Sequence, residues 1–252
     1  MALDIGNSSV NIGVYTNEIE RVIRLNTYPI LKLESYRDVF KKIMDDNLLI
    51  GDKTGLIISS VVPEVSNLII LALKELIDEE PLIVSYMIKT GLLYMITEPS
   101  RLGSDRIANA VAANEIYKGP AIIVDFGTAT SISIIDGRNN FIGGSIFPGL
   151  RMMSKSLAEG AALLKEVELV PPPSSIGSNT TGCIKAGIFF GLAGATARII
   201  DEVKRETGYT FKIIVTGGFS ELIKGYLEYD YILHPHLTLD GLKILYRKNR
   251  DA

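Results

Sequence analysis

The chain has 252 residues, 47% of them hydrophobic, and a formal net charge of −3. This charge excludes a protein held on nucleic acid by bulk positive charge, and the length suits one large domain or two of ordinary size. The one cysteine, Cys183, excludes an intrachain disulfide framework and is expected to be buried in an apolar helix.

The first third of the chain alternates predicted strands with predicted helices. Tyr36, Val39, Phe40, Ile43 and Met44 fall on one helical face, with Ser35 as the expected N-cap. Strands are predicted over residues 1–3, 10–15, 20–25, 54–62 and 81–85, and helices over 36–44, 63–77 and 104–117.

The pattern then restarts at residue 121. Strands are predicted over 121–125, 130–135, 140–147 and 211–215, and helices over 149–164, 180–208, 220–227 and 237–248. Hairpins followed by alternating strands and helices, repeated once, indicate two α/β domains, 1–118 and 119–252. No signal peptide and no uncharged apolar run of about 18 residues is visible, which predicts a soluble, cytoplasmic protein.

A short phrase occurs in both halves, each time after an apolar strand. Asp4-Ile5-Gly6-Asn7-Ser8 opens the chain, and Asp125-Phe126-Gly127-Thr128-Ala129 stands in the middle. Glycine lets the backbone approach a ligand, freed N–H groups and the hydroxyl can donate to phosphate, and the aspartate can hold a cation. The repeat predicts two phosphate loops that serve one nucleotide.

Three further phrases have catalytic character. Residues 99–106 place Asp105 and Arg106 at the start of a predicted helix. The positive end of the helix dipole favours the aspartate there, but it does not explain the arginine. Residues 143–150 and 216–219 pair glycines at the ends of strands, which lets a ligand reach bare backbone. The chain has no Walker A loop and no G-x-G-x-x-G after a strand, and His234-Pro235-His236 is interpreted as a surface loop rather than a zinc site.

Together these phrases resemble the type III pantothenate kinases, within the acetate and sugar kinase, Hsp70 and actin superfamily. The family pattern is D-x-G-N-T, P-x-x-x-G-x-D-R, D-x-G-T-A, G-G-x-I-x-P-G and T-G-G, and every phrase occurs here in that order, with Ser8 in place of the first threonine. The resemblance covers nearly the whole chain. It implies two ribonuclease H-like (actin-like ATPase) domains with a nucleotide cleft between them, and ATP-dependent phosphorylation of pantothenate, the first step of coenzyme A biosynthesis.

The resemblance also implies a role for individual residues. Asp105 would be the catalytic residue, ionised at its helix N-terminus and therefore a weak base. The ATP-binding residues would be Asp4, Ile5, Gly6, Asn7, Ser8, Ser9, Val10, Asn11 and Thr128. The acceptor would be bound by Ile96, Gly103, Ser104, Asp105, Arg106 and Thr180, the last from the neighbouring subunit of a homodimer. Asp125 would hold a monovalent cation, potassium or ammonium, and magnesium would enter with ATP; no nucleic-acid or membrane partner is expected.

Two positions depart from the family pattern near the expected acceptor site. Ile96 stands where the family usually has tyrosine, and Lys185 where it commonly has glutamine. Three interpretations therefore stay open: a pantothenate kinase, which is favoured; a kinase of the same fold for another small hydroxy acid; and a non-catalytic regulatory protein. Five retained residues speak against the third: Asp4, Asp105, Arg106, Asp125 and Thr128.

Overall fold

The computed structural model describes residues 1–15, 19–46 and 54–250, which divide into two compact units. The first unit contains Met1–Leu92, Thr97–Glu115 and Leu237–Ala252, and the second contains Leu93–Ile96 and Ile116–His236. The predicted domains 1–118 and 119–252 differ from these units in three segments. Leu237–Ala252 belongs to the first unit, and Leu93–Ile96 and residues 116–118 belong to the second.

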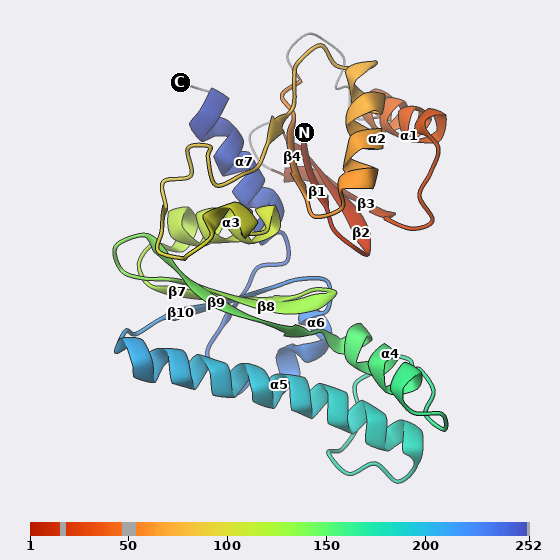
Figure 1. The fold of residues 1–252 in the computed structure, drawn as a ribbon, viewed down its shortest axis with the longest axis vertical. Coiled ribbons are helices and arrows are strands. Elements are labelled where there is room, and N and C mark those ends of the chain that lie inside the picture. Colours follow the sequence, from red (N-terminus) through yellow and green to blue (C-terminus); the bar gives the residue numbers. More distant parts are fainter. Residues whose placement is uncertain (16–18, 47–53, 251–252) are drawn as a thin grey trace. The chain divides into compact units, whose positions relative to one another are not determined.

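The first unit is a five-stranded sheet with helices on both faces (Figure 1). Its strands are β1 (Ala2–Ile5), β2 (Ser9–Tyr15), β3 (Ile19–Asn26), β4 (Ile57–Ser60) and β5 (Leu82–Ile83). Its helices are α1 (Leu33–Asp46), α2 (Pro63–Lys74), the 3₁₀ turn η1 (Pro99–Arg101), α3 (Ser104–Ala112) and α7 (Leu237–Arg250). α3 continues into a π-helical turn, η2 (Ala113–Tyr117), whose last two residues belong to the second unit.

Because successive side chains of a strand point to opposite faces, each face of the first sheet packs against a different pair of helices. Leu3, Ile5 and Ile58 pack with the apolar sides of α1 and α2 in one core. Asp4 and Ser59 have the opposite parity, and they therefore point to the face that carries α3 and α7. Those two helices lie very close together, because a side chain at Gly241 would meet the Ala108 carbonyl oxygen at 2.0 Å. This close packing explains why α7 belongs to the first unit.

The second unit contains the longest helix of the described chain. Its strands are β6 (Leu93–Tyr94), β7 (Ala121–Phe126), β8 (Ala129–Ile135), β9 (Asn140–Pro148), β10 (Lys212–Thr216) and β11 (Ile232–Leu233). Its helices are α4 (Leu150–Gly160), α5 (Thr180–Thr207), α6 (Ser220–Ile223) and the 3₁₀ turn η3 (Lys224–Tyr226).

The two sheets repeat one topology, as the sequence pattern predicts. The first has the order β3-β2-β1-β4-β5, and the second has β11-β10-β7-β8-β9-β6, which is the same order read in reverse with β6 added. In each, three antiparallel strands are followed by two strands that join in parallel. The first strand of each repeat, β1 or β7, lies at the centre and ends in one of the two aspartate phrases. The fold is therefore the mixed α/β architecture of two related units that the sequence predicts.

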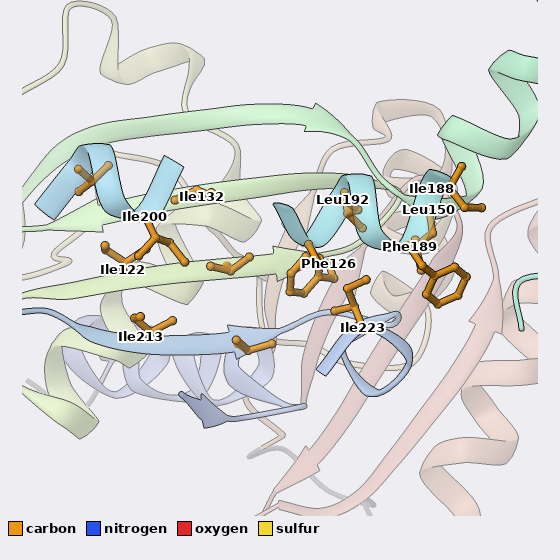
Figure 2. Packing of buried hydrophobic residues seen from close by; sticks show 14 of the residues in the cluster. Ile122, Phe126, Ile132, Leu150, Ile188, Phe189, Leu192, Ile200, Ile213 and Ile223 are labelled. Carbon is orange, nitrogen blue, oxygen red and sulfur yellow. The ribbon is translucent and has the colours of Figure 1, made fainter. Parts of the chain in front are cut away.

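α5 covers one face of the second sheet (Figure 2). Ile188, Phe189, Leu192 and Ile200 of this helix pack against strand residues such as Ile122, Phe126, Ile132 and Ile213. By length and composition α5 could span a membrane, and 44% of its most apolar stretch is buried in the structure. Its packing in this core accounts for that apolar face, because core helices of soluble proteins have the same composition. The expected burial of Cys183 is wrong: it lies on the exposed side of α5.

Most predicted elements are found, and the differences are at their ends. α1 begins at Leu33, so Ser35 lies inside the helix rather than capping it. The helix predicted over 104–117 changes to π-helical geometry after Ala112. The short strands β6 and β11 are not predicted, because two paired residues carry no periodic signal.

Candidate active site

The first aspartate phrase forms a tight turn between β1 and β2. The Gly6 N–H donates to the Ser9 carbonyl at 3.0 Å, and the Thr27 hydroxyl donates to the Gly6 carbonyl at 2.6 Å. Asn7 and Ser8 at the tip are exposed. A ligand can therefore reach the tip of this loop, whose base is held by Thr27, the residue that follows β3.

Not every residue predicted for ATP binding can offer its side chain. Ile5 and Val10 are fully buried in the core of the first unit, so only their backbone groups could meet a ligand. Ser9 is also buried. Within this loop the side chains left for this role belong to Asp4, Asn7, Ser8 and Asn11.

Both carboxylate oxygens of Asp4 are held by neighbouring strands. Asn11 donates from its side-chain amide to Asp4 Oδ2 at 3.4 Å. Ser59 donates from its hydroxyl to Asp4 Oδ1 at 3.2 Å. These contacts follow from register, because Asn11 on β2 and Ser59 on β4 are the direct partners of Asp4 on β1. Asp4 is thus fixed at the end of the central strand.

The start of α3 carries the predicted acceptor residues. Gly103 is the N-cap, and the Arg106 N–H donates to Asp105 Oδ1 at 2.8 Å. A Cβ atom at Gly103 would lie 2.5 Å from Asp105 Oδ1, so a residue without a side chain leaves room for that carboxyl group. Ser104 does not cap the helix: its hydroxyl accepts from the Ser60 N–H at 2.9 Å and lies 3.1 Å from the Ser60 carbonyl oxygen. The first turn of α3 is therefore attached to the end of β4.

The expected ionisation behaviour of Asp105 is wrong in direction. Burial raises the pKa of the Asp105 carboxyl above its ordinary value, and this effect outweighs the backbone hydrogen bonds and the positive charge of Arg106, which lower it. Burial likewise lowers the pKa of the Arg106 guanidinium, against the opposing charge of Asp105. Desolvation outweighs the helix dipole here, and a carboxylate with a raised pKa is a better proton acceptor than the sequence predicts.

The second aspartate phrase gathers several of the predicted motifs within the second unit. A Cβ atom at Gly217 would lie 2.4 Å from Asp125 Oδ1, and one at Gly149 would lie 2.6 Å from the carbonyl oxygens of Gly127 and Thr128. Gly217 has φ +97°, a conformation that favours glycine. The phrases at residues 125–129, 143–150 and 216–219 therefore meet at one end of the second sheet.

Two predicted acceptor residues, Ile96 and Thr180, belong to the second unit, whereas α3 belongs to the first. Ile96 follows β6 in the second unit, where its side chain lies 4.0 Å from a Cβ placed on Gly143. Thr180 is exposed in the first turn of α5, whose N-cap Asn179 accepts from the Gly182 N–H at 2.8 Å. The residues of the first unit (Asp4, Ser104, Asp105) form one connected group, and those around Asp125 form another.

Sequence reasoning missed two residues of the first group. Thr27 contacts the turn of the first aspartate phrase and Ser59 contacts its aspartate, and both residues are fully buried. Ser59 could have been found from the sequence, because it is a polar residue at the end of an apolar segment that is predicted to be a strand. Among residues 1–15, 19–46 and 54–250, no group of three or more histidine, cysteine, aspartate or glutamate side chains could hold a metal ion.

Comparison with known proteins gives a consistent result. Residues 1–202 match the family model of the type III pantothenate kinases. The chain is similar to a type III pantothenate kinase of Agathobacter rectalis, with 37% identity over 98% of this chain and 96% of the relative.

Solved structures of lower sequence similarity share the fold. One is a protein from Campylobacter jejuni named as a conserved putative Baf family transcriptional activator, with TM-score 0.61, 21% identity and coverage of 100% of this chain and 99% of that one. Another is component A of the (R)-2-hydroxyglutaryl-CoA dehydratase of Acidaminococcus fermentans, with TM-score 0.54, 13% identity and coverage of 98% and 94%. At these identities the two structures bear on the fold alone.

Proposed function

The chain belongs to the type III pantothenate kinase family, and we propose that it transfers the γ-phosphoryl group of ATP to the primary hydroxyl of pantothenate. The product is 4′-phosphopantothenate, and the reaction is the first step of coenzyme A biosynthesis. The family consists of soluble biosynthetic enzymes, and we assign the reaction to the cytoplasm.

The observation that carries this proposal is the environment of Asp105. Its carboxyl group lies at the start of α3, has a raised pKa and is followed directly by a cation, Arg106. In the reaction the hydroxyl oxygen of pantothenate forms a bond to the γ-phosphorus, the bond from that phosphorus to the β,γ-bridging oxygen breaks, and the hydroxyl proton passes to Asp105. Because the transition state of phosphoryl transfer is loose, orientation of the hydroxyl matters more than a strong base.

The phosphate groups of ATP have two matching loops. The turn at Asp4–Asn11 offers backbone N–H groups and the exposed Asn7 and Ser8, and Thr128 offers a hydroxyl in the second unit. Magnesium bound to ATP usually needs only one or two protein carboxylates in addition to the phosphates. Asp4 could supply such a carboxylate. When bound, the magnesium ion would neutralise negative charge that develops on the phosphates.

We further propose that Asp125 holds a monovalent cation. The backbone of two glycines lies close to Asp125 Oδ1. A Cβ atom placed on Gly217 would lie 2.4 Å from this oxygen, and one placed on Gly127 would lie 3.3 Å from it. A carboxylate framed by peptide groups supplies the oxygen ligands that a hard cation such as potassium prefers. The cation would compensate the charge of the nearby nucleotide phosphates.

The experiment that tests the proposal measures ATP consumption by the purified protein across a panel of small hydroxy acids, with and without potassium. We expect consumption with pantothenate, at a rate that falls when potassium and ammonium are removed. Consumption with a different acceptor would indicate a kinase of the same fold, for which Ile96 and Lys185 would be the first residues to explain. Intact ATP binding without consumption in the presence of any acceptor would favour a regulatory role and contradict the proposal.

We also propose that the chain forms a homodimer through the exposed side of α5. Phe190 on that side is 42% exposed, and Cβ atoms placed on Gly187 and Gly194 meet nothing within 4 Å. Small residues beside an exposed aromatic ring let a second helix approach closely. In such a dimer Thr180, in the first turn of the same helix, would serve the acceptor site of the neighbouring subunit.

Replacing Gly187 by glutamate is expected to convert the dimer into monomers, because a charge would then occupy the centre of this face. Glutamate favours a helix over glycine by roughly 0.5–1 kcal/mol, so the helix itself is not weakened. Light scattering coupled to size-exclusion chromatography measures the mass. Gly225→Glu is the matched control, since Gly225 also has open space around it but lies outside α5. A dimeric Gly187→Glu protein would exclude this face as the interface.

A further inference from the structure

Ser59 is a fully buried polar residue at the end of β4. It stands in direct parallel register with Asp4 at the end of β1, and both side chains point to the face that carries α3. Its hydroxyl group therefore lies between the first phosphate loop and the helix that carries Asp105.

The hydroxyl of Ser59 contacts a functional residue on each side. Its Oγ atom is 3.2 Å from Asp4 Oδ1 and 3.0 Å from Ser104 Oγ. An ionised carboxylate can only accept, so the single proton of Ser59 is best used toward Asp4. The lone pairs of Ser59 are then left to accept from the Ser104 hydroxyl, which has the Ser60 carbonyl at 3.1 Å as its alternative acceptor.

The contacts continue from Ser104 to Asp105 through a single peptide. Ser104 is the first residue of α3, and the Ser60 N–H fixes its Oγ atom at 2.9 Å. A shift of Ser104 would therefore move the first turn of α3, and the Asp105 carboxyl with it. Asp4, Ser59, Ser104 and Asp105 form a continuous connection within the first unit from the phosphate loop to the proposed base.

We propose that Ser59 is a positioning residue that fixes the Asp4 carboxylate and the first turn of α3 relative to each other. Its hydroxyl sets the orientation of Asp4 and, through Ser104, the position of Asp105. The residues that contact the nucleotide phosphates and the acceptor hydroxyl are thereby held at a fixed distance and orientation. The inference rests on the proposed function, which supplies the roles of Asp4 and Asp105. A serine that only satisfied buried polar groups would contribute to stability, and its replacement would leave kcat unchanged.

The test compares four proteins: wild type, Ser59→Ala, Asp4→Asn and the double variant. Because hydrogen bonds to charged groups are strong, we expect Ser59→Ala to lower kcat for pantothenate phosphorylation about ten- to hundredfold. The KM for pantothenate should change less than kcat. In the Asp4→Asn background, Ser59→Ala should lower kcat much less, because the carboxylate that Ser59 orients is gone.

Ser66→Ala is the matched control, since Ser66 is a buried serine of α2 in the same unit. It should lose stability at most, with kcat near the wild-type value. Equal effects of Ser59→Ala in both backgrounds, or an effect no larger than that of Ser66→Ala, would overturn the inference. The same four proteins are titrated with MgATP by calorimetry, where we expect the same coupling between Ser59 and Asp4. That titration needs no acceptor, so a wild-type protein inactive on pantothenate would refute the proposed function while this coupling still decides the inference.

Discussion

Replacing Asp105 by asparagine is expected to lower kcat for pantothenate phosphorylation by about 10²–10⁴-fold, the usual worth of a positioned general base. Asparagine has nearly the same shape but cannot take the hydroxyl proton. Binding of MgATP, measured by calorimetry, should stay largely intact, because the proposed phosphate contacts lie in the loop at Asp4–Asn11 and at Thr128. A variant that phosphorylates pantothenate at close to the wild-type rate would remove this role from Asp105.

Stability should change in the opposite direction to activity. Burial raises the pKa of Asp105 in the folded state, so the folded protein binds this proton more tightly than the unfolded chain does. The resulting contribution to stability is fully present below the unfolded pKa and is lost as the pH rises through the folded pKa. Above the unfolded pKa, folding must therefore either desolvate the charged carboxyl group or protonate it, a cost that asparagine lacks. We expect Asp105→Asn to have a higher Tm than wild type at pH 7, with a difference that shrinks on acidification.

Glu64→Gln provides the matched control for Asp105→Asn. Glu64 is also an acid in the first turn of a helix, α2, but it is exposed and lies outside the proposed site. Its replacement removes only a favourable interaction with the helix dipole, which should lower Tm slightly and leave kcat unchanged. If Tm were lower in both variants and kcat were unchanged in both, Asp105 would be a helix-terminal residue without a catalytic role.

The pH profile of the reaction gives an independent measurement of the same carboxyl group. A base works in its ionised form, so kcat/KM should fall on the acid side as Asp105 becomes protonated. Because the pKa of Asp105 is raised, this fall is expected at a higher pH than that of an ordinary aspartate.

The sequence predicts the repeated sheet and the two aspartate-glycine turns because these depend on local pattern. A strand, an aspartate and a glycine turn recur at Asp4 and Asp125, and each proves to end the central strand of its sheet. The place of α7 could not be predicted in this way. It depends on Gly241, which lets the helix approach Ala108, and such a contact joins residues far apart in the chain.

The direction in which the pKa of Asp105 is shifted could not be predicted from the sequence. The position of Asp105 at a helix N-terminus is visible in the sequence and favours the anion, whereas its burial arises from tertiary packing and favours the neutral acid. The second effect is the larger one. Ser59 was missed for a related reason: its importance depends on the parallel register of β4 with β1, which local periodicity does not report.

Arg106→Ala is expected to raise the KM for pantothenate by about ten- to hundredfold, the loss that corresponds to a charge-assisted hydrogen bond of about 1.5–3 kcal/mol. The KM for ATP should change little. The reason is that the guanidinium group, next to the proposed base, offers two parallel donors to the carboxylate of the acceptor. Equal increases in both KM values would remove Arg106 from the acceptor site.

Two comparisons separate this role from a general effect of charge. Arg101→Ala removes a nearby arginine that is exposed and paired with Glu98 at 3.4 Å, and it should leave both KM values near wild type. Arg106→Lys keeps the charge but loses the planar fork, so its KM for pantothenate should fall between those of wild type and Arg106→Ala.

The acceptor itself supplies the decisive comparison for Arg106. An analogue of pantothenate whose carboxylate is replaced by a hydroxymethyl group keeps the reacting hydroxyl but cannot pair with a guanidinium. Wild type should use this analogue with a much higher KM than pantothenate, and Arg106→Ala should use the two acceptors with similar KM values. If Arg106→Ala still preferred pantothenate as strongly as wild type does, the carboxylate would be recognised by another residue.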